Sequence, residues 1–250
     1  MSEDAEARKQ EIRPLVLQPR EEDFLDVPDT NLSIAKDLIT DTKREPVVVA
    51  NWFQAKETAK VLDTGFDLPT LSTLMKAKKS LPLSPLESGD LTVEIGGEWT
   101  DSAVAWPDEY GRYSPRIRIP GVSEGKNPIL IEHSKLRDDS KFPGLFKYVL
   151  VDGVVTELPN LPRYEGYVEE FDEKTGLPTK LHSLKPKDKT GLVYYNPNLP
   201  RDSYQDEMCM GLRAVALGRK NNVISLVWPT GILLTYLGFR VNRAKKLSGY

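Results

Sequence analysis

The hydrophobic positions divide the chain into parts with different periods. Between 31 and 82 apolar residues recur every three or four positions, between 90 and 195 they alternate with polar ones, and after 203 they form uncharged runs. The first spacing predicts helices and the second predicts strands. We therefore expect an α+β protein in four segments: an extended charged arm over 1–30, a helical segment over 31–88, an antiparallel β-rich module over 89–200, and a C-terminal helical segment over 203–250.

Three short helices are predicted within the helical segment. Asn31 is suited to cap the first, which carries Ile34 and its neighbours Ala35 and Leu38. The second follows from an apolar stripe that runs from Val48 to Leu62. The third is expected to start near 67–69 and to end with lysines, which favour the negative end of a helix dipole.

The β-rich module contains several candidate strands, with the sequences LTVEI at 91–95, RIRI at 116–119, PILIEHS at 128–134 and GLVYY at 191–195. Two hairpins are also predicted. YVLVDGVVTEL at 148–158 has Asp-Gly at its centre, the pair that type I′ turns favour. YVEEFDEKTGLPTKLHSL at 167–184 has Gly176 available for a left-handed position.

The stretch from Val223 to Phe239 contains no charged residue. As a helix it would be just short of the roughly 30 Å hydrocarbon core of a bilayer. No acidic residue follows Glu207, and basic residues stand on both borders of the run. The pattern predicts a single transmembrane helix, with anionic phospholipid or the membrane border in contact with Arg219, Lys220, Tyr236, Arg240, Arg243, Lys245 and Lys246.

Proline and glycine make this helix prediction more specific. Pro229 is costly inside a soluble helix, whereas membrane neighbours can satisfy the carbonyl that it frees. We expect a kinked helix packed against another protein's helix through Ser225, Pro229, Gly231 and Gly238. Two alternatives remain open: a buried strand VISLV with a WPTG turn and a second strand ILLTYLGF, or a helical hairpin formed with 208–218.

Composition excludes several classes of site. The chain has 250 residues, a net charge of −3 and one cysteine, Cys209, so neither an intrachain disulfide nor a cysteine-based metal cluster is expected. The residues after Glu207 carry seven basic side chains, whereas residues 1–207 have a net charge of −10, which disfavours a nucleic-acid-binding surface outside the C-terminal segment. The N-terminus lacks the apolar region of a secretory signal peptide.

No catalytic, cofactor-binding or metal-binding residue is predicted. His133 and His182 are the only histidines, and neither stands in a zinc motif. Ser134 and Glu132 adjoin His133, but neighbours on a strand point to opposite faces, which disfavours a triad. Carboxylates interleaved with aromatics are typical of glycosidase clefts; here they are more simply solvent-facing residues of a hairpin: Glu94, Glu98, Asp101, Asp108 and Glu109.

These features favour a non-catalytic accessory subunit of a multi-subunit membrane complex, anchored by one C-terminal helix. By analogy of architecture, it looks like a supernumerary subunit of a mitochondrial respiratory-type inner-membrane assembly. Its expected partners are other subunits and phospholipid, with no small-molecule substrate. One alternative is a soluble structural protein of a virion or other large particle, with a buried C-terminal segment. Another is a hydrolase with a carboxylate site near residues 94–110.

Overall fold

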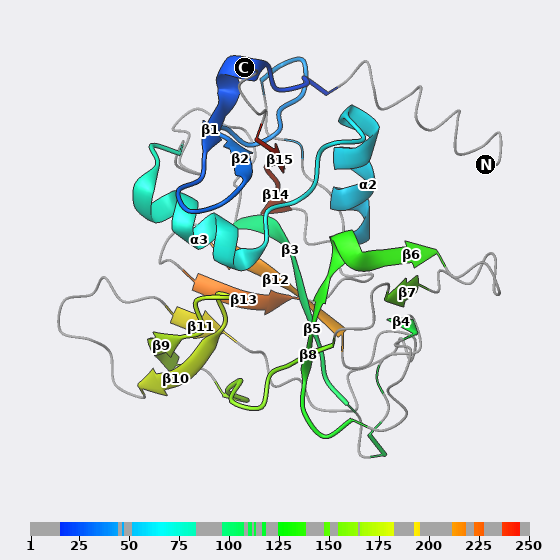
Figure 1. The fold of residues 1–250 in the computed structure, drawn as a ribbon, viewed down its shortest axis with the longest axis vertical. Coiled ribbons are helices and arrows are strands. Elements are labelled where there is room, and N and C mark those ends of the chain that lie inside the picture. The colour runs from blue at the N-terminus through cyan, green and yellow to red at the C-terminus, as the bar shows by residue number, and fades with distance from the viewer. Residues whose placement is uncertain are drawn as a thin grey trace.

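The structure is a computed structural model, and it describes residues 16–44, 47, 52–83, 97–107, 110–111, 113, 117–118, 125–138, 148–150, 155–164, 166–182, 193–195, 212–218, 223–227 and 237–245. These residues form a mixed fold of three sheets and two short α-helices (Figure 1). Most strand pairs are antiparallel. The sequence prediction of a mixed protein with short helices and antiparallel sheet is therefore confirmed.

The main sheet is built from strands distant in sequence. Its neighbours pair antiparallel except β11 with β13 and β14 with β3, which are parallel. In spatial order the strands are β10 (Pro178–His182), β9 (Gly166–Phe171), β11 (Val193–Tyr195), β13 (Val223–Val227), β12 (Leu212–Gly218), β3 (Gly97–Ala105), β5 (Ile129–Glu132) and β8 (Thr156–Glu157), with β14 (Leu237–Gly238) beside β3.

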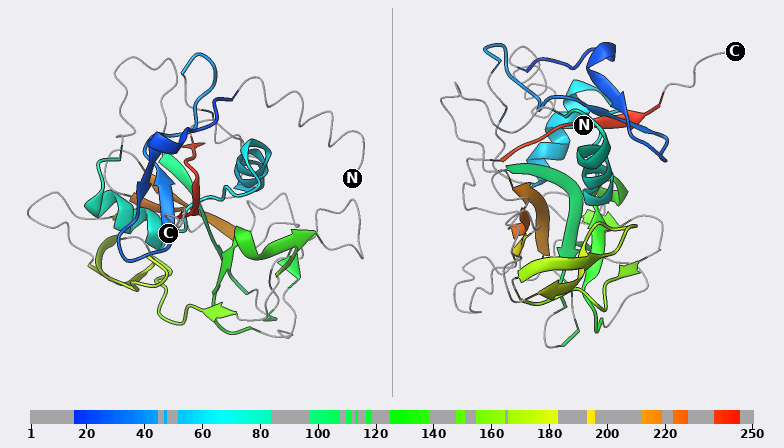
Figure 2. Two further views of the ribbon diagram at one scale, coloured as in Figure 1. Left: turned by 45° about the horizontal axis from the view of Figure 1, so that its top comes forward. Right: turned by 90° about the vertical axis from the view of Figure 1, so that its left-hand side faces the viewer.

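Two smaller sheets have three strands each. One contains β1 (Phe24–Asp26), β2 (Leu32–Ala35) and β15 (Asn242–Ala244), with β2 in the middle. Segments from near the two ends of the chain therefore share a sheet, as Figure 2 shows in blue and red. The other contains β4 (Ile117–Arg118), β7 (Tyr148–Leu150) and β6 (Leu136–Asp138).

The helices α2 (Trp52–Leu62) and α3 (Leu71–Ser80) lie on either side of β3 (Figure 1). Apolar side chains of α2 join Trp99 and Ala103 of β3 in one buried cluster. Those of α3 join Val104 in a second cluster. Successive residues of a strand face opposite sides, so β3 supplies both cores. The described residues also include two single turns of 3₁₀ helix, η1 (Glu21–Asp23) and η2 (His133–Lys135).

The second and third predicted helices are confirmed by α2 and α3. Thr70 caps α3, because its side chain accepts a hydrogen bond from the backbone N–H of Thr73. The first prediction was wrong, since Ile34 and Ala35 lie in β2. Both are buried, and β2 pairs on one edge with β1, its neighbour in sequence, and on the other with β15, from the distant C-terminal segment. Such tertiary pairing overrides a short helical spacing.

The C-terminal segment also differs from its predicted helix. Leu212–Gly218 is strand β12 between β3 and β13, and Val223–Val227 is strand β13. The alternative in which VISLV is a strand is therefore confirmed for these residues, of which Ile224 is buried, and the helix prediction is wrong for them. No helix in the described part of the chain has the length and apolarity needed to cross a bilayer. Residues 228–236 lie outside the description.

The strand predictions had mixed outcomes. The hairpin expected over 167–184 is confirmed by β9 and β10, with Gly176 at a φ of 75°. The other predicted hairpin, over 148–158, contains the strands β7 and β8, but these two strands pair in different sheets. The predictions over 116–119, 128–134 and 191–195 correspond to β4, β5 and β11. The segment at 91–95 lies outside the described residues.

Candidate functional site

A β-bulge interrupts the central strand β3. Trp99 pairs with Ala216 and Ala103 pairs with Ala214, so the three residues 100–102 face Val215 alone. The Thr100 hydroxyl donates to the Val215 carbonyl at 2.8 Å and accepts from the Ser102 N–H at 3.3 Å. These bonds satisfy groups that the regular ladder would otherwise pair. Bulges often stand beside functional sites because they redirect side chains.

Asp101 lies at the centre of this bulge and is buried. Its Oδ1 accepts from the backbone N–H of Ser134 at 3.0 Å, and its Oδ2 accepts from the Ser134 hydroxyl at 2.7 Å. Burial raises the pKa of Asp101 to about 7, against the opposing effects of Lys56 and the Ser134 hydrogen bond. Asp101 is therefore a buried acid that titrates in the neutral range.

A series of alternating charges leads outward from Asp101. Burial lowers the pKa of Lys56 on α2, while Asp101 and Asp67 oppose that shift. The Lys56 Nζ lies 3.5 Å from Asp67 Oδ1, and the Lys60 Nζ, one helical turn later, lies 2.9 Å from Asp67 Oδ2. The exposed fraction of the side chain rises from 11% at Lys56 to 37% at Lys60. The alternating charges thus form a series that runs from the buried Asp101 to the partly exposed Lys60 of α2.

A second charge centre surrounds Glu98. The Arg240 Nε donates to Glu98 Oε2 at 2.6 Å, and the Lys78 Nζ lies 2.8 Å from Oε1. Burial by itself favours the neutral acid, but Arg240 and Lys78 together hold the pKa of Glu98 below its usual value. The Arg240 guanidinium also donates to the carbonyls of Ala35 and Lys36. This centre therefore fastens the C-terminal segment to the N-terminal one.

The two carboxylates singled out by the sequence have separate partners. Glu98 meets Lys78 of α3, whereas Asp101 interacts with Lys56 of α2. A paired-carboxylate hydrolase needs its acid and base on the two sides of one scissile bond. In the structure these two residues have different partners, and both are buried rather than solvent-facing. The other three carboxylates, Glu94, Asp108 and Glu109, lie outside the described residues.

The residues predicted at a membrane border have varied surroundings where they are described. Arg240 is fully buried. Arg243 pairs with Glu21, and its guanidinium lies 3.9 Å from the ring centroid of Phe24. The backbone N–H of Lys245 donates to the Asn31 carbonyl. The remaining border residues lie outside the description: Arg219, Lys220, Tyr236 and Lys246.

The predicted helix-packing residues occupy strands where they are described. Ser225 of β13 pairs with Ala216 on one side and with Tyr195 on the other. Gly238 of β14 stands opposite Glu98. Pro229 and Gly231 lie outside the described residues.

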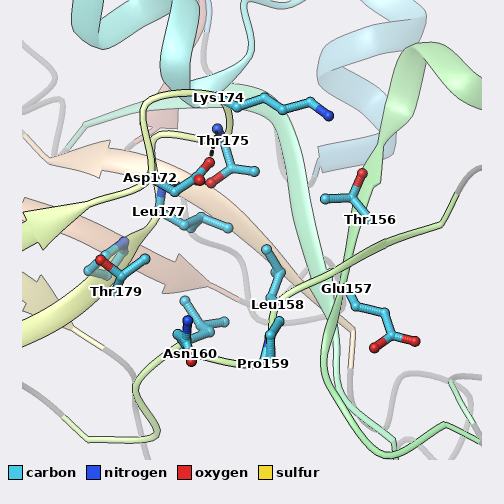
Figure 3. A pocket seen from close by; sticks show the side chains of 12 residues that line it. Thr156, Glu157, Leu158, Pro159, Asn160, Asp172, Lys174, Thr175, Leu177 and Thr179 are labelled. Carbon is cyan, nitrogen blue, oxygen red and sulfur yellow. Dashed lines mark hydrogen bonds between the residues drawn. The ribbon is translucent and has the colours of Figure 1, made fainter.

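A pocket of about 150 Å³ opens between the loop 156–161 and the turn of the β9–β10 hairpin (Figure 3). Figure 3 shows Leu158 and Leu177 approaching each other across it, with Lys174 above and Asn160 below. The side chains that line it are Thr156, Glu157, Leu158, Pro159, Asn160, Leu161, Asp172, Lys174, Thr175, Leu177, Pro178 and Thr179. Its interior is apolar and its rim is polar.

The hairpin side of this pocket is held firmly. Asp172 Oδ1 accepts from the Thr175 N–H at 2.7 Å within the turn. The Ser72 hydroxyl of α3 donates to the Glu173 carbonyl at 2.7 Å. A Cβ added at Gly176 would lie 2.8 Å from the Ser72 nitrogen, so only glycine permits this approach. The wall of the pocket is therefore positioned by α3.

Exposed aromatic side chains adjoin, in sequence, the two segments that line this pocket. Tyr164 is 55% exposed and follows the loop 156–161, while Phe171 is 47% exposed and precedes the turn. Phe171 stands opposite Pro178, which lines the pocket. The sequence interpretation missed this site. Its only sequence signals are the aromatic residues beside Pro- and Gly-containing turns, and such residues are common in cores as well.

Within the described residues, no group of three or more His, Cys, Asp or Glu side chains is arranged to hold a metal ion. His182 lies at the sheet edge, where its Nε2 is 3.3 Å from Glu169 Oε2. No family model, no curated protein and no solved structure matches this chain.

Proposed function

We propose that the chain is a non-catalytic structural component of a larger protein assembly. The pocket beside the β9–β10 hairpin supports this proposal most directly. Of the large hydrophobic side chains that are exposed in the described residues, two adjoin its lining segments in sequence: Tyr164 stands three residues after Leu161, and Phe171 precedes Asp172. Tyrosine and phenylalanine are enriched at protein interfaces, where they bury large area at little entropic cost.

The dimensions of the pocket suit a side chain of a partner protein. Its volume of about 150 Å³ is below the range of ~300–1,000 Å³ that small-molecule sites have. Leu158, Leu161 and Leu177 offer apolar contact in its interior, and the polar rim would exclude water around an inserted group. The proposed partner is a neighbouring subunit that inserts one apolar side chain here.

Two kinds of assembly could contain such a component. One is a membrane complex, such as an organellar inner-membrane assembly, and the other is a lipid-free particle. The predicted membrane anchor covers 223–239, but Val223–Val227 is strand β13. Any anchor would therefore have to be formed by the residues after β13. Alkaline carbonate treatment of membranes separates the two settings: retention in the pellet would favour an integral anchor, and release into the supernatant would refute it.

The proposal is tested by native purification of the chain from its source, followed by native electrophoresis and identification of the co-migrating subunits. We expect the wild-type chain to migrate in a complex of constant composition. The double substitution Tyr164→Ser and Phe171→Ser should release it. Tyr110→Ser is the matched control, because Tyr110 is also exposed but stands far in sequence from the segments that line the pocket. A wild-type chain that migrates alone would refute the proposal.

The second candidate function is a hydrolase. Its support in the structure is Asp101, whose carboxyl accepts a hydrogen bond from the hydroxyl of the exposed residue Ser134. A carboxylate near a hydroxyl can act as a general base, which is the observation in its favour. The test is hydrolysis of a panel of ester and glycoside substrates by the wild type and by Asp101→Asn. Equal rates for the two proteins would remove this alternative.

A further inference from the structure

The two outermost strands of the main sheet line the same pocket. Among the strands that the structure describes, β8 pairs with β5 alone and β10 pairs with β9 alone. Thr156 and Glu157 of β8 line the pocket, and so do Pro178 and Thr179 of β10. Figure 3 shows Thr156 and Glu157 on one side and Thr179 on the other. The sheet therefore curls until its two edges face each other, and the pocket lies in the seam between them.

The outer edge of β8 presents backbone groups of Glu157. The Leu158 N–H donates to the Pro128 carbonyl at 2.8 Å, toward β5. Since hydrogen-bonded and non-hydrogen-bonded positions alternate in an antiparallel pair, the N–H and the carbonyl of Glu157 point away from β5. Glu157 is exposed, and no residue within the described ranges pairs with these two groups. An unpaired edge of this kind is a template for another strand.

The outer edge of β10 is less suited to pairing. Pro178 has no N–H, the register shifts between Pro178 and Lys180, and the Lys180 side chain is 56% exposed. A proline, a bulge and an exposed lysine are features that keep an edge strand from pairing with another chain. The strand β8 contains none of these three. We therefore expect β8 to accept a strand and β10 to supply the opposite wall of the pocket.

The charges around the pocket determine which segment fits there. Glu157 and Asp172 line it, Glu173 follows Asp172 in the turn, and all three are exposed. Among the described lining residues, Lys174 is the one with a positive charge. Complementary potentials steer partners together, so this excess of negative charge favours a basic segment.

We propose that the partner, a subunit of another sequence, presents a basic extended segment that pairs with the edge of β8 and inserts one apolar side chain into the pocket. This inference rests on the proposed function, because it requires a neighbouring subunit. The added strand would satisfy the N–H and the carbonyl of Glu157. Successive side chains of a strand point to opposite faces, so the neighbours of the inserted residue face away from the pocket. A cavity of about 150 Å³ holds a benzene-sized group, which corresponds to a leucine or phenylalanine side chain.

Amide hydrogen exchange tests the pairing directly, by comparing the natively purified complex with the isolated full chain. We expect the Glu157 N–H to exchange about tenfold more slowly in the complex, because the added strand accepts a hydrogen bond from it. The Leu158 N–H is the internal reference, since it is bonded to Pro128 in either form and its exchange should change little.

Two results of this comparison would overturn the inference. Equal exchange of the Glu157 N–H in the two forms would show that no strand is added at β8, although the chain is part of a complex. Protection of Glu157 in a complex made only of copies of this chain would show self-pairing and not pairing with a subunit of another sequence.

Glu157→Pro removes the N–H that the added strand needs. The preceding residue, Thr156, lies in a strand, which is the conformation that a following proline favours, and edge positions tolerate proline. We expect this variant to fold and to migrate outside the complex in native electrophoresis. If it does not fold, the exchange comparison still decides, because that comparison uses the wild type alone.

Asp26→Pro is the matched control. Asp26 is also an exposed acid on an edge strand, and its backbone groups point away from β2, because the Val27 N–H donates to the Leu32 carbonyl. Each of the two substitutions also removes one side-chain hydrogen bond. The Asp26 variant should remain in the complex, and its release to the same extent as Glu157→Pro would overturn the inference.

The variants also separate this inference from the function on which it rests. If Glu157→Pro stays in the complex while the double variant Tyr164→Ser and Phe171→Ser is released, the strand pairing is wrong and the proposed function stands. A wild-type chain that migrates alone would overturn both.

Discussion

Arg240 and Glu98 form a fully buried ion pair, with 2.6 Å between Nε and Oε2, across a separation of 142 residues. Lys78 supplies a second cation to the same carboxylate, and the carbonyls of Ala35 and Lys36 accept further bonds from the arginine. A buried pair adds little net stability over an apolar pair, but it penalises any arrangement that leaves one partner alone. It therefore specifies how the two terminal segments meet β3.

Arg240→Met should lower the free energy of unfolding by about 3–5 kcal/mol, because Glu98 then remains charged in the interior with Lys78 as its one cation. Chemical denaturation measures this loss. Adding Glu98→Gln should recover a large part of it, since the unpaired charge is then removed.

Arg243→Met is the control for the arginine substitution. The Glu21 side chain that Arg243 contacts is 56% exposed, so the loss of that ion pair should cost less than about 1 kcal/mol. Equal losses for the two arginine variants would contradict the structural role given to Arg240.

Asp101→Asn should change how stability depends on pH. The folded chain keeps the Asp101 proton up to about pH 7, whereas the unfolded chain loses it near 3.8. Between these values the wild type therefore becomes less stable as pH rises, and above 7 the whole penalty, about 4 kcal/mol, applies. The asparagine variant avoids this penalty.

Urea denaturation across the pH range is the measurement for Asp101→Asn. The difference in stability between variant and wild type should grow in favour of the variant from about pH 4 to about pH 7 and then stay constant. A difference that is independent of pH would show that Asp101 ionises in the folded chain as it does in the unfolded one.

Gly176→Ala should destabilise the protein by about 2 kcal/mol, because the residue has a φ of 75° and its new Cβ would meet the Ser72 nitrogen at 2.8 Å. Thermal unfolding measures this effect. Gly65→Ala is the matched control: its Cβ would meet only the Asp63 carboxylate, at 3.2 Å, and that side chain can move.

Thr70→Ala should cost about 1 kcal/mol, because the first turn of α3 loses the side-chain cap that the Thr73 N–H uses. Thr70→Ser keeps the hydroxyl and should retain nearly all of the stability. If the alanine and serine variants unfold at the same denaturant concentration, the Thr70 hydroxyl does not stabilise the protein as a cap.

Sequence reasoning failed most clearly at β3. Glu98, Thr100, Asp101 and Ser102 give this strand the polar character of a surface segment, yet all four are buried. Their partners are Arg240, Val215, Ser134 and the Leu71 N–H, all distant in sequence. A local pattern does not contain these partners, and without them burial of a charge is prohibitively costly. The sequence therefore singled out Glu98 and Asp101, but it did not reveal that they are buried or which residues are their partners.

In the C-terminal segment, too, the local sequence did not determine the structure, although the residues there are apolar. A short run of apolar residues is compatible with a buried strand or with a buried helix, and periodicity alone does not separate them. Neighbouring strands decided the matter for Val223–Val227, which lies between β11 and β12. The basic residues after Phe239, which had indicated lipid, include Arg240 in an internal ion pair.

The sequence by itself determined the features that depend on neighbouring residues: the amphipathic helices α2 and α3, and the β9–β10 hairpin with its left-handed Gly176. Only the tertiary structure decided which strands lie at the centre of the sheet, which charges are buried, and where the pocket opens. The physical reason is that helix spacing and turn conformation are local, whereas a buried charge or a central strand becomes favourable only when distant segments supply its partners.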